Sequence, residues 1–106
     1  MPDDTPILAI SIAADYDAEA MAPFFAALPE AVTPYLDTFT LLNADGKFDT
    51  VEGKSPTAVV VTRWPSRAAF DEYWNSPAHQ RAKDKREGLG SFTVLVVEDP
   101  SGSSSP

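Results

Sequence analysis

A chain of 106 residues has room for one domain, and a content of 43% hydrophobic and 23% charged residues is typical of a protein with a packed core. The sequence contains no cysteine, which excludes disulfides, thiolate metal sites and thiol catalysis and suits the reducing cytoplasm, where we expect the protein to act. A formal net charge of −8 repels phosphate backbones, and no stretch approaches the roughly 20 apolar residues of a membrane span, so we expect neither a nucleic-acid nor a membrane partner.

The first predicted element is a buried strand over residues 6–13, a short run rich in isoleucine. Asp17 is a suitable N-cap for a helix that begins at the next residue. Pro23 and Pro29 lie inside this helix and each removes a backbone donor, so we expect it to be kinked or interrupted and to end before Pro34. Its apolar residues follow the spacing of one helical face: Met21, Phe24, Phe25, Leu28 and Val32.

Alternating apolar and polar residues predict a second strand over 35–43. The sequence Asn-Ala-Asp-Gly over 43–46 is typical of a turn, after which residues 47–52 are interpreted as a short returning hairpin arm. The clearest strand spans 57–64, because it contains a run of three valines.

Two capping signals follow. Ser66 is expected to cap a helix starting at the next residue, and Ser76 with Pro77 starts a further helical piece that runs to about Glu87 and ends at Gly88. The dense basic stretch within this piece is interpreted as a solvated helix face; it comprises Arg81, Lys83, Lys85 and Arg86. A final buried strand spans 91–98, which completes one domain over residues 1–98, and residues 99–106 are predicted to be a disordered tail.

The order strand, helix, strand, strand, helix, strand predicts an α+β protein of the ferredoxin-like βαββαβ type, with a four-stranded antiparallel sheet and the helices on one face. The strands are apolar on both alternating faces, as Val59 and Val61 on one side and Ala58 and Val60 on the other illustrate. Helices cover only one of these faces. We therefore expect a second copy of the chain to cover the other, in a homodimer formed through the sheet face.

Several short motifs in the second half of the chain carry a resemblance to a known family. They are Val51-Glu52-Gly53, Ala58-Val59-Val60-Val61, Arg63-Trp64-Pro65-Ser66, Ala68-Ala69-Phe70, Trp74, Asn75-Ser76-Pro77 and His79-Gln80. On these motifs the chain resembles the bacterial domain-of-unknown-function family thirteen-thirty, within the dimeric α/β-barrel superfamily that includes antibiotic biosynthesis monooxygenases. The resemblance covers residues 50–98 by motif and residues 6–43 by element order, and it implies a dimeric α/β barrel.

The same superfamily includes cofactor-independent quinone-forming monooxygenases, polyketide cyclases, lactone isomerases and haem-degrading enzymes. Trp64 sits where several of the oxygenases place a pocket tryptophan. This chain departs from the quinone-forming members, which tend to have Asn four residues earlier and Tyr six residues later, because it has Val60 and Phe70 there. Haem-degrading members carry an iron-ligating histidine where this chain offers Lys83 or Lys85. The resemblance thus implies no haem, and we expect no cofactor.

His79 is the single histidine, and its side chain has an unperturbed pKa near neutrality. It stands where the resembled family usually has Tyr, so it is a candidate proton acceptor, although a surface or packing role also fits. Arg63 is expected to point into the barrel between subunits, where it needs a partner: Asp37, or a carboxylate or phenolate of a ligand. Tyr16 lies in the loop after the first strand, a common place for substrate contacts. The sequence shows no metal-spaced cluster of histidines and carboxylates.

The leading hypothesis is a cofactor-independent enzyme acting on a small aromatic or polyketide-like molecule, by oxygenation, cyclisation or isomerisation begun by proton abstraction. In this hypothesis His79 is the base, and Arg63 or Tyr16 stabilises an oxyanion. The side chains that would line the substrate pocket are Trp64, Tyr73 and Phe24. The alternative is a non-catalytic small-ligand-binding or stress-related dimer, which predicts either no enclosed cavity near Trp64 or a cavity whose lining has no ionisable group. Core packing alone is the other interpretation of Trp64.

Overall fold

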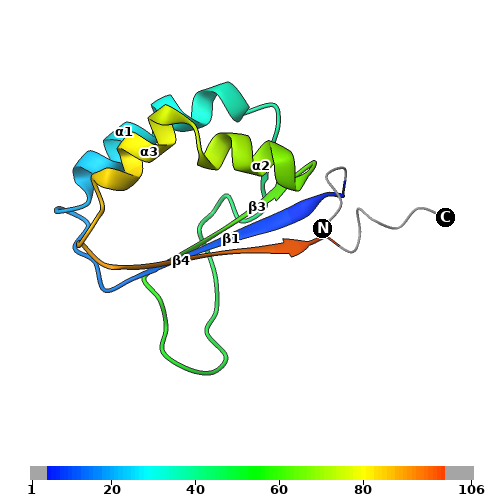
Figure 1. Ribbon diagram of the computed structural model, residues 1–106. Coiled ribbons are helices and arrows are strands. Elements are labelled where there is room, and N and C mark those ends of the chain that lie inside the picture. The colour runs from blue at the N-terminus through cyan, green and yellow to red at the C-terminus, as the bar shows by residue number, and fades with distance from the viewer. Residues whose placement is uncertain (1–4, 100–106) are drawn as a thin grey trace.

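The computed structural model describes residues 5–99. Its sheet is antiparallel with strand order β2-β3-β1-β4, made of β1 (Ile7–Ala14), β2 (Thr40–Leu41), β3 (Ala58–Trp64) and β4 (Ser91–Glu98). The helices α1 (Ala22–Val32), α2 (Arg67–Trp74) and α3 (Pro77–Asp84) lie on one side of this sheet (Figure 1). The ferredoxin-like fold predicted from the order of elements is confirmed, with the second helical region divided into α2 and α3.

The first helix begins later than its capping signal predicts. The Asp17 carboxylate does not cap α1; it accepts a hydrogen bond from the backbone N–H two residues further on (3.0 Å), which closes a turn. Pro23 lies in the first helical turn, where its missing N–H is not needed, so this proline starts the helix instead of kinking it. The helix contains Pro29 and ends before Pro34, as predicted.

The second strand is much shorter than the alternation of residues predicts. The first part of the expected strand is a 3-10 helix, η1 (Thr33–Tyr35), and a turn, and only two residues of β2 pair with β3. The Asn43 side chain then takes over the role of backbone: its amide donates to the carbonyl oxygen of Val59 (2.7 Å) and its oxygen accepts from the N–H of Val61 (2.9 Å). These bonds satisfy the edge of β3 where the strand pairing stops.

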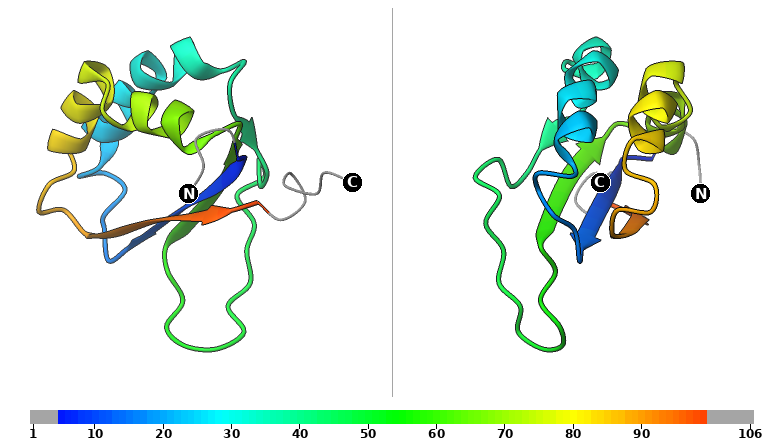
Figure 2. Two further views of the ribbon diagram at one scale, coloured as in Figure 1. Left: turned by 45° about the vertical axis from the view of Figure 1, so that its right-hand side comes forward. Right: turned by 90° about the vertical axis from the view of Figure 1, so that its left-hand side faces the viewer.

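The turn predicted at 43–46 is confirmed, since the Gly46 N–H donates to the Asn43 carbonyl oxygen (2.8 Å) and Gly46 has a φ of 72°, which favours glycine. No strand forms over the predicted hairpin arm, residues 47–52. Instead residues 42–57 extend away from the side of the sheet that carries the helices, as the green loop in Figures 1 and 2 shows.

Both capping serines of the second helical region act as predicted. The Ser66 hydroxyl accepts a hydrogen bond from the Ala69 N–H (3.0 Å) at the start of α2, and the Ser76 hydroxyl accepts one from the His79 N–H (3.3 Å) at the start of α3. Helix α3 ends at Asp84, three residues before the expected boundary, and turns lead to Gly88, which has a φ of 79°.

The two faces of the sheet have different neighbours. Ile7 and Ala9 of β1 point towards the helices and pack with Trp64 and Phe70 in the main buried cluster. A smaller cluster of Met21, Phe24 and Ala82 joins α1 to α3. The strand register places the alternate residues on the opposite side, which we call the outer face: Leu8, Ile10, Ile12, Val59, Val61, Leu95 and Val97.

The outer face is open within the described chain. The side chains of Leu95 and Val97 are 47% and 41% exposed, and no described helix packs on this side. Arg63 belongs to this face by register, and its Nε lies 2.7 Å from Oδ2 of Asp99, which is buried. The partner of Arg63 is therefore Asp99 and not Asp37. Asp99 is the first residue of the predicted tail, and the rest of that prediction, residues 100–106, lies outside the described residues.

Candidate functional site

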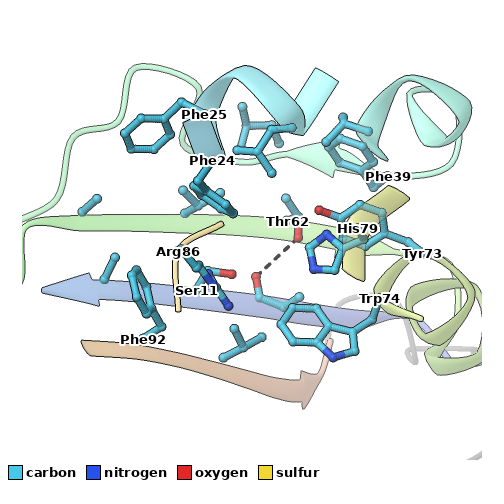
Figure 3. Close-up of a pocket in the computed structure, with 18 of the residues that line it drawn as sticks. Ser11, Phe24, Phe25, Phe39, Thr62, Tyr73, Trp74, His79, Arg86 and Phe92 are labelled. Atoms are coloured by element: carbon cyan, nitrogen blue, oxygen red, sulfur yellow. Dashed lines mark hydrogen bonds between the residues drawn. The ribbon is translucent and has the colours of Figure 1, made fainter. Parts of the chain in front are cut away.

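A cavity of about 330 Å³ lies between the helix-covered face of the sheet and the helices. Its lining is mostly apolar and strongly aromatic, with rings from α1, the segment before β2, the end of β3, α2 and the start of β4. Figure 3 shows Phe24, Phe39, Trp74 and Phe92 among them. This volume is at the lower end of the range for small-molecule pockets, about 300–1,000 Å³.

The floor of the cavity carries two hydroxyls, from Ser11 of β1 and Thr62 of β3. The indole N–H of Trp64 donates to Oγ1 of Thr62 (2.9 Å), and this hydroxyl in turn contacts the carbonyl oxygen of Ala9 (3.4 Å). The indole is stacked on the ring of Phe39 with a centroid separation of 5.0 Å. Trp64 is therefore both a core residue, 2% exposed, and a wall of the cavity.

His79 enters the cavity from the first turn of α3 (Figure 3). Its ring lies between those of Tyr73 and Trp74, at centroid distances of 4.5 and 4.7 Å, and the residue is only 4% exposed. Within residues 5–99, neither Nδ1 nor Nε2 of His79 has a hydrogen-bond partner. Buried polar groups are normally paired, so these two nitrogens, which have almost no exposed surface, leave hydrogen-bonding capacity unused beside the cavity.

Burial, and after it the positive charges of Lys83 and Arg86, together lower the pKa of His79 from 6.5 to about 4. The imidazole is therefore uncharged at neutral pH, with one nitrogen able to donate and the other to accept.

This shift predicts a pH dependence of stability. The unfolded chain binds a proton at His79 below about pH 6.5 and the folded protein only below about pH 4, so stability is lost as the pH falls through that window. We expect His79 to account for a loss of about 2 kcal/mol of unfolding free energy between about pH 7.5 and about pH 5. Urea unfolding at both pH values measures it. The variant His79→Gln should lose stability less steeply, and identical pH slopes for the two proteins would contradict the shift.

Tyr73 is the second polar group at this end of the cavity. Burial raises the pKa of Tyr73 to about 12, although the positive charge of Arg86 works in the opposite direction. The phenol therefore keeps its proton at neutral pH. It can donate a hydrogen bond to a ligand oxygen but cannot serve as a base.

Five of the six residues expected at the site line this cavity, namely Tyr16, Phe24, Trp64, Tyr73 and His79. The sixth, Arg63, lies on the outer face with Asp99 and is separated from the other five by the sheet. The structure thus brings the aromatic walls and His79 together, while the catalytic and binding roles assigned to these residues stay predictions.

Arg86 also lines the cavity, which the sequence interpretation missed by treating it as part of a solvated basic face. Its guanidinium lies over the ring of Phe92, 4.4 Å from the centroid, and over that of Phe24 at 5.3 Å. The spacing held a usable signal: residues 79, 82 and 86 are separated by three and four positions, so in the helix predicted to run to about Glu87 Arg86 shares a face with His79 and Ala82, both buried.

Within residues 5–99, no three His, Cys, Asp or Glu side chains gather closely enough to hold a metal ion. The helices of this part of the chain are also too short to cross a bilayer.

The sequence matches a family model described as a domain of unknown function, DUF1330, over residues 7–100. This match spans most of the chain and includes every described strand and helix. No curated protein matches the sequence.

Solved structures share the fold at low sequence identity. A protein of unknown function from Rhodopseudomonas palustris is 17% identical with a TM-score of 0.68, covering 91% of this chain and 83% of its own. A dimeric ferredoxin-like protein of unknown function from Jannaschia is 20% identical with a TM-score of 0.61, and the match covers 89% of this chain and 99% of the Jannaschia chain. A mutant of SnoaB, a cofactor-independent oxygenase from Streptomyces nogalater, is 12% identical with a TM-score of 0.60, and the match covers 96% of this chain and 99% of the SnoaB chain. These likenesses establish the architecture alone.

Proposed function

The chain belongs to the DUF1330 family, whose function is unknown. From the cavity of this chain we propose that the protein binds a small aromatic or polyketide-like molecule there and removes a proton from it. The observation that carries this proposal is the buried, uncharged His79 in the lining of an aromatic cavity, whose two ring nitrogens have no hydrogen-bond partner among residues 5–99. The similarity in fold to a cofactor-independent oxygenase supports it.

The proposed step is a single proton transfer. A C–H or O–H bond of the substrate breaks, the electron pair stays on the substrate as an enolate or phenolate, and the proton moves to a ring nitrogen of His79. The anion then reacts with dioxygen, attacks a carbonyl carbon of the same molecule, or takes a proton at another carbon. These three fates correspond to oxygenation, cyclisation and isomerisation, and none requires a cofactor for the first step.

The low pKa of His79, about 4, restricts the substrate. An imidazole of this basicity removes a proton only from an acidic position, such as a carbon between two carbonyl groups or a hydroxyl on an electron-poor ring. The imidazolium that forms must then be stabilised by the enolate beside it, in a cavity whose low polarity strengthens their attraction. The neutral Tyr73 phenol is placed to donate to an oxygen of this anion.

The same low pKa favours one other candidate function, a binding protein without catalysis, in which neutral His79 only donates and accepts hydrogen bonds. Both functions use the same cavity and the same ligand class. They differ in whether the protein accelerates the loss of a substrate proton.

Proton exchange separates the two. Cyclic 1,3-diketones and anthrone-type ketones have acidic methylene protons, and their exchange for deuterium is measured by NMR, while quenching of tryptophan fluorescence measures binding. We expect the wild-type protein to accelerate exchange and His79→Gln to lose that acceleration by at least about 100-fold, with binding changed only a fewfold. Lys85→Gln, an exposed change at the residue directly after α3, is the matched control and should exchange like the wild type. Binding without acceleration in the wild type would establish the non-catalytic function instead.

We also propose that the chain forms a homodimer through its outer face. A patch of seven aliphatic side chains on an uncovered sheet is costly in water, and isologous packing of two such patches buries both. The dimeric state of the similar Jannaschia protein supports this arrangement. The cavity lies on the other side of the sheet, so each subunit would keep its own.

A further inference from the structure

Among residues 5–99, Arg86 is the only member of the cavity lining that carries a formal charge at neutral pH, since these residues contribute no Asp, Glu or Lys to the lining and His79 is uncharged there. The guanidinium is partly withdrawn from solvent, and burial lowers the pKa of Arg86 from its ordinary value, though arginine stays protonated in proteins. A positive charge in an apolar cavity costs free energy unless an anion or a hydrogen-bond acceptor pairs with it.

The described chain supplies only weak compensation. The four ion pairs among residues 5–99 join Lys54 to Asp15, Arg63 to Asp99, Arg67 to Asp71 and Arg81 to Glu30, and none includes Arg86. The guanidinium instead rests on the faces of Phe92 and Phe24. These contacts hold its plane in place while leaving its N–H groups, the donors that match a carboxylate, without a carboxylate partner in this part of the chain.

The charge also acts on the rest of the cavity. Arg86 contributes to the low pKa of His79 and opposes the high pKa of Tyr73, so its field reaches both polar groups of the proposed reaction site. Lys83 adds a second positive charge that acts on His79, and its Nζ lies 4.5 Å from the ring centroid of Trp74. Two positive charges thus act on the cavity of a protein whose net charge is −8.

From these observations we propose that the ligand of this cavity is an aromatic acid whose carboxylate pairs with Arg86 while its ring lies among the aromatic side chains. The inference rests on the proposed function only in taking the cavity as the ligand site. Figure 3 shows Arg86 with Phe92 and Phe24 towards one end of the cavity and His79 with Tyr73 and Trp74 towards the other. A carboxylate at the first end therefore directs the far side of the ring towards His79.

Matched ligand pairs test this assignment. Naphthoic and hydroxynaphthoic acids are compared with their carboxamides, which have nearly the same shape and no charge, by tryptophan fluorescence and calorimetry. We expect the wild-type protein to bind each acid at least about tenfold more tightly than its amide. Arg86→Met keeps an unbranched apolar stem against Phe24 and Phe92 and should remove this preference, while Arg86→Lys should retain part of it.

The preference within the wild-type protein decides the question even where Arg86→Met fails to fold. Equal binding of acids and amides, or no binding of any acid below about 10 mM, overturns the assignment. His79→Gln should keep the preference for acids, because the pairing at Arg86 does not need the imidazole. A preference for acids without proton exchange would refute the proposed reaction alone, and exchange without the preference would refute the assignment of Arg86 alone.

Discussion

The variant Ile10→Lys is expected to convert the proposed dimer into a monomer of 11.4 kDa. Ile10 lies at the centre of the outer face, where the register places it opposite Val61 of β3 on one side and Leu95 of β4 on the other. Two-fold symmetry brings each substitution into the interface twice, so two ammonium groups would be buried against aliphatic side chains without a carboxylate.

We expect a loss of at least about 4 kcal/mol of association free energy, which raises the dissociation constant by roughly a thousandfold. Sedimentation velocity or light scattering over a concentration series measures it, with the wild-type protein as dimer throughout. Within the monomer Ile10 is only half-buried, so the fold should survive, and far-UV circular dichroism checks this.

Ala26→Lys is the matched control, because it adds the same charge to an exposed position of α1, on the helical side of the sheet. It should leave the dimer intact. A wild-type protein that remains monomeric well above micromolar concentration would refute the dimer, and so would an Ile10→Lys protein that associates like the wild type.

Much of this fold was predictable because local signals and burial agree. Ser66 and Ser76 cap the helices that their sequence positions indicate, and β3 and β4 lie within one residue of their predicted bounds. Each capping serine accepts a hydrogen bond from an N–H only three residues further on, and the β-branched residues of each strand favour a strand locally.

The predictions failed where contacts between residues distant in sequence determine the local structure. The alternation over residues 35–43 resembles a strand, but Tyr35 lies in η1 instead. The centroid of its ring is 5.5 Å from that of Tyr73. Asn43 then pairs with β3 through its side chain, which no local pattern reveals. The start of α1 was misplaced for a different reason, since Asp17 and Pro23 carry competing signals and the proline prevails.

The candidate site was predictable in its aromatic residues and not in its charge. Trp64, Tyr73 and His79 were identified from motif and residue type, and they line one cavity. Arg86 was assigned to solvent because basic stretches on helices usually face water. Only the packing of Phe24 from α1 and Phe92 from β4 around its guanidinium, two contacts far apart in sequence, brings this arginine inside.

Trp64→Ala is expected to remove a large part of the stability of the domain. Trp64 is 2% exposed and lies at the centre of an aromatic cluster, with Phe39, Tyr73 and Phe70 at centroid distances of 5.0, 5.1 and 5.6 Å. The substitution also leaves the hydroxyl of Thr62 without its indole donor. Replacing a buried Trp by Ala usually costs about 3–5 kcal/mol, a large part of the roughly 5–15 kcal/mol that stabilises a domain.

Trp64→Phe separates the two contributions, because phenylalanine keeps a ring in the cluster and removes only the indole hydrogen bond and part of the volume. We expect it to cost about 1–2 kcal/mol. Urea unfolding followed by far-UV circular dichroism, at one fixed protein concentration because association adds to apparent stability, gives both values. A cost below about 1 kcal/mol for Trp64→Ala would mean that the ring serves the cavity alone and that the buried cluster around Ile7 stabilises the fold without it.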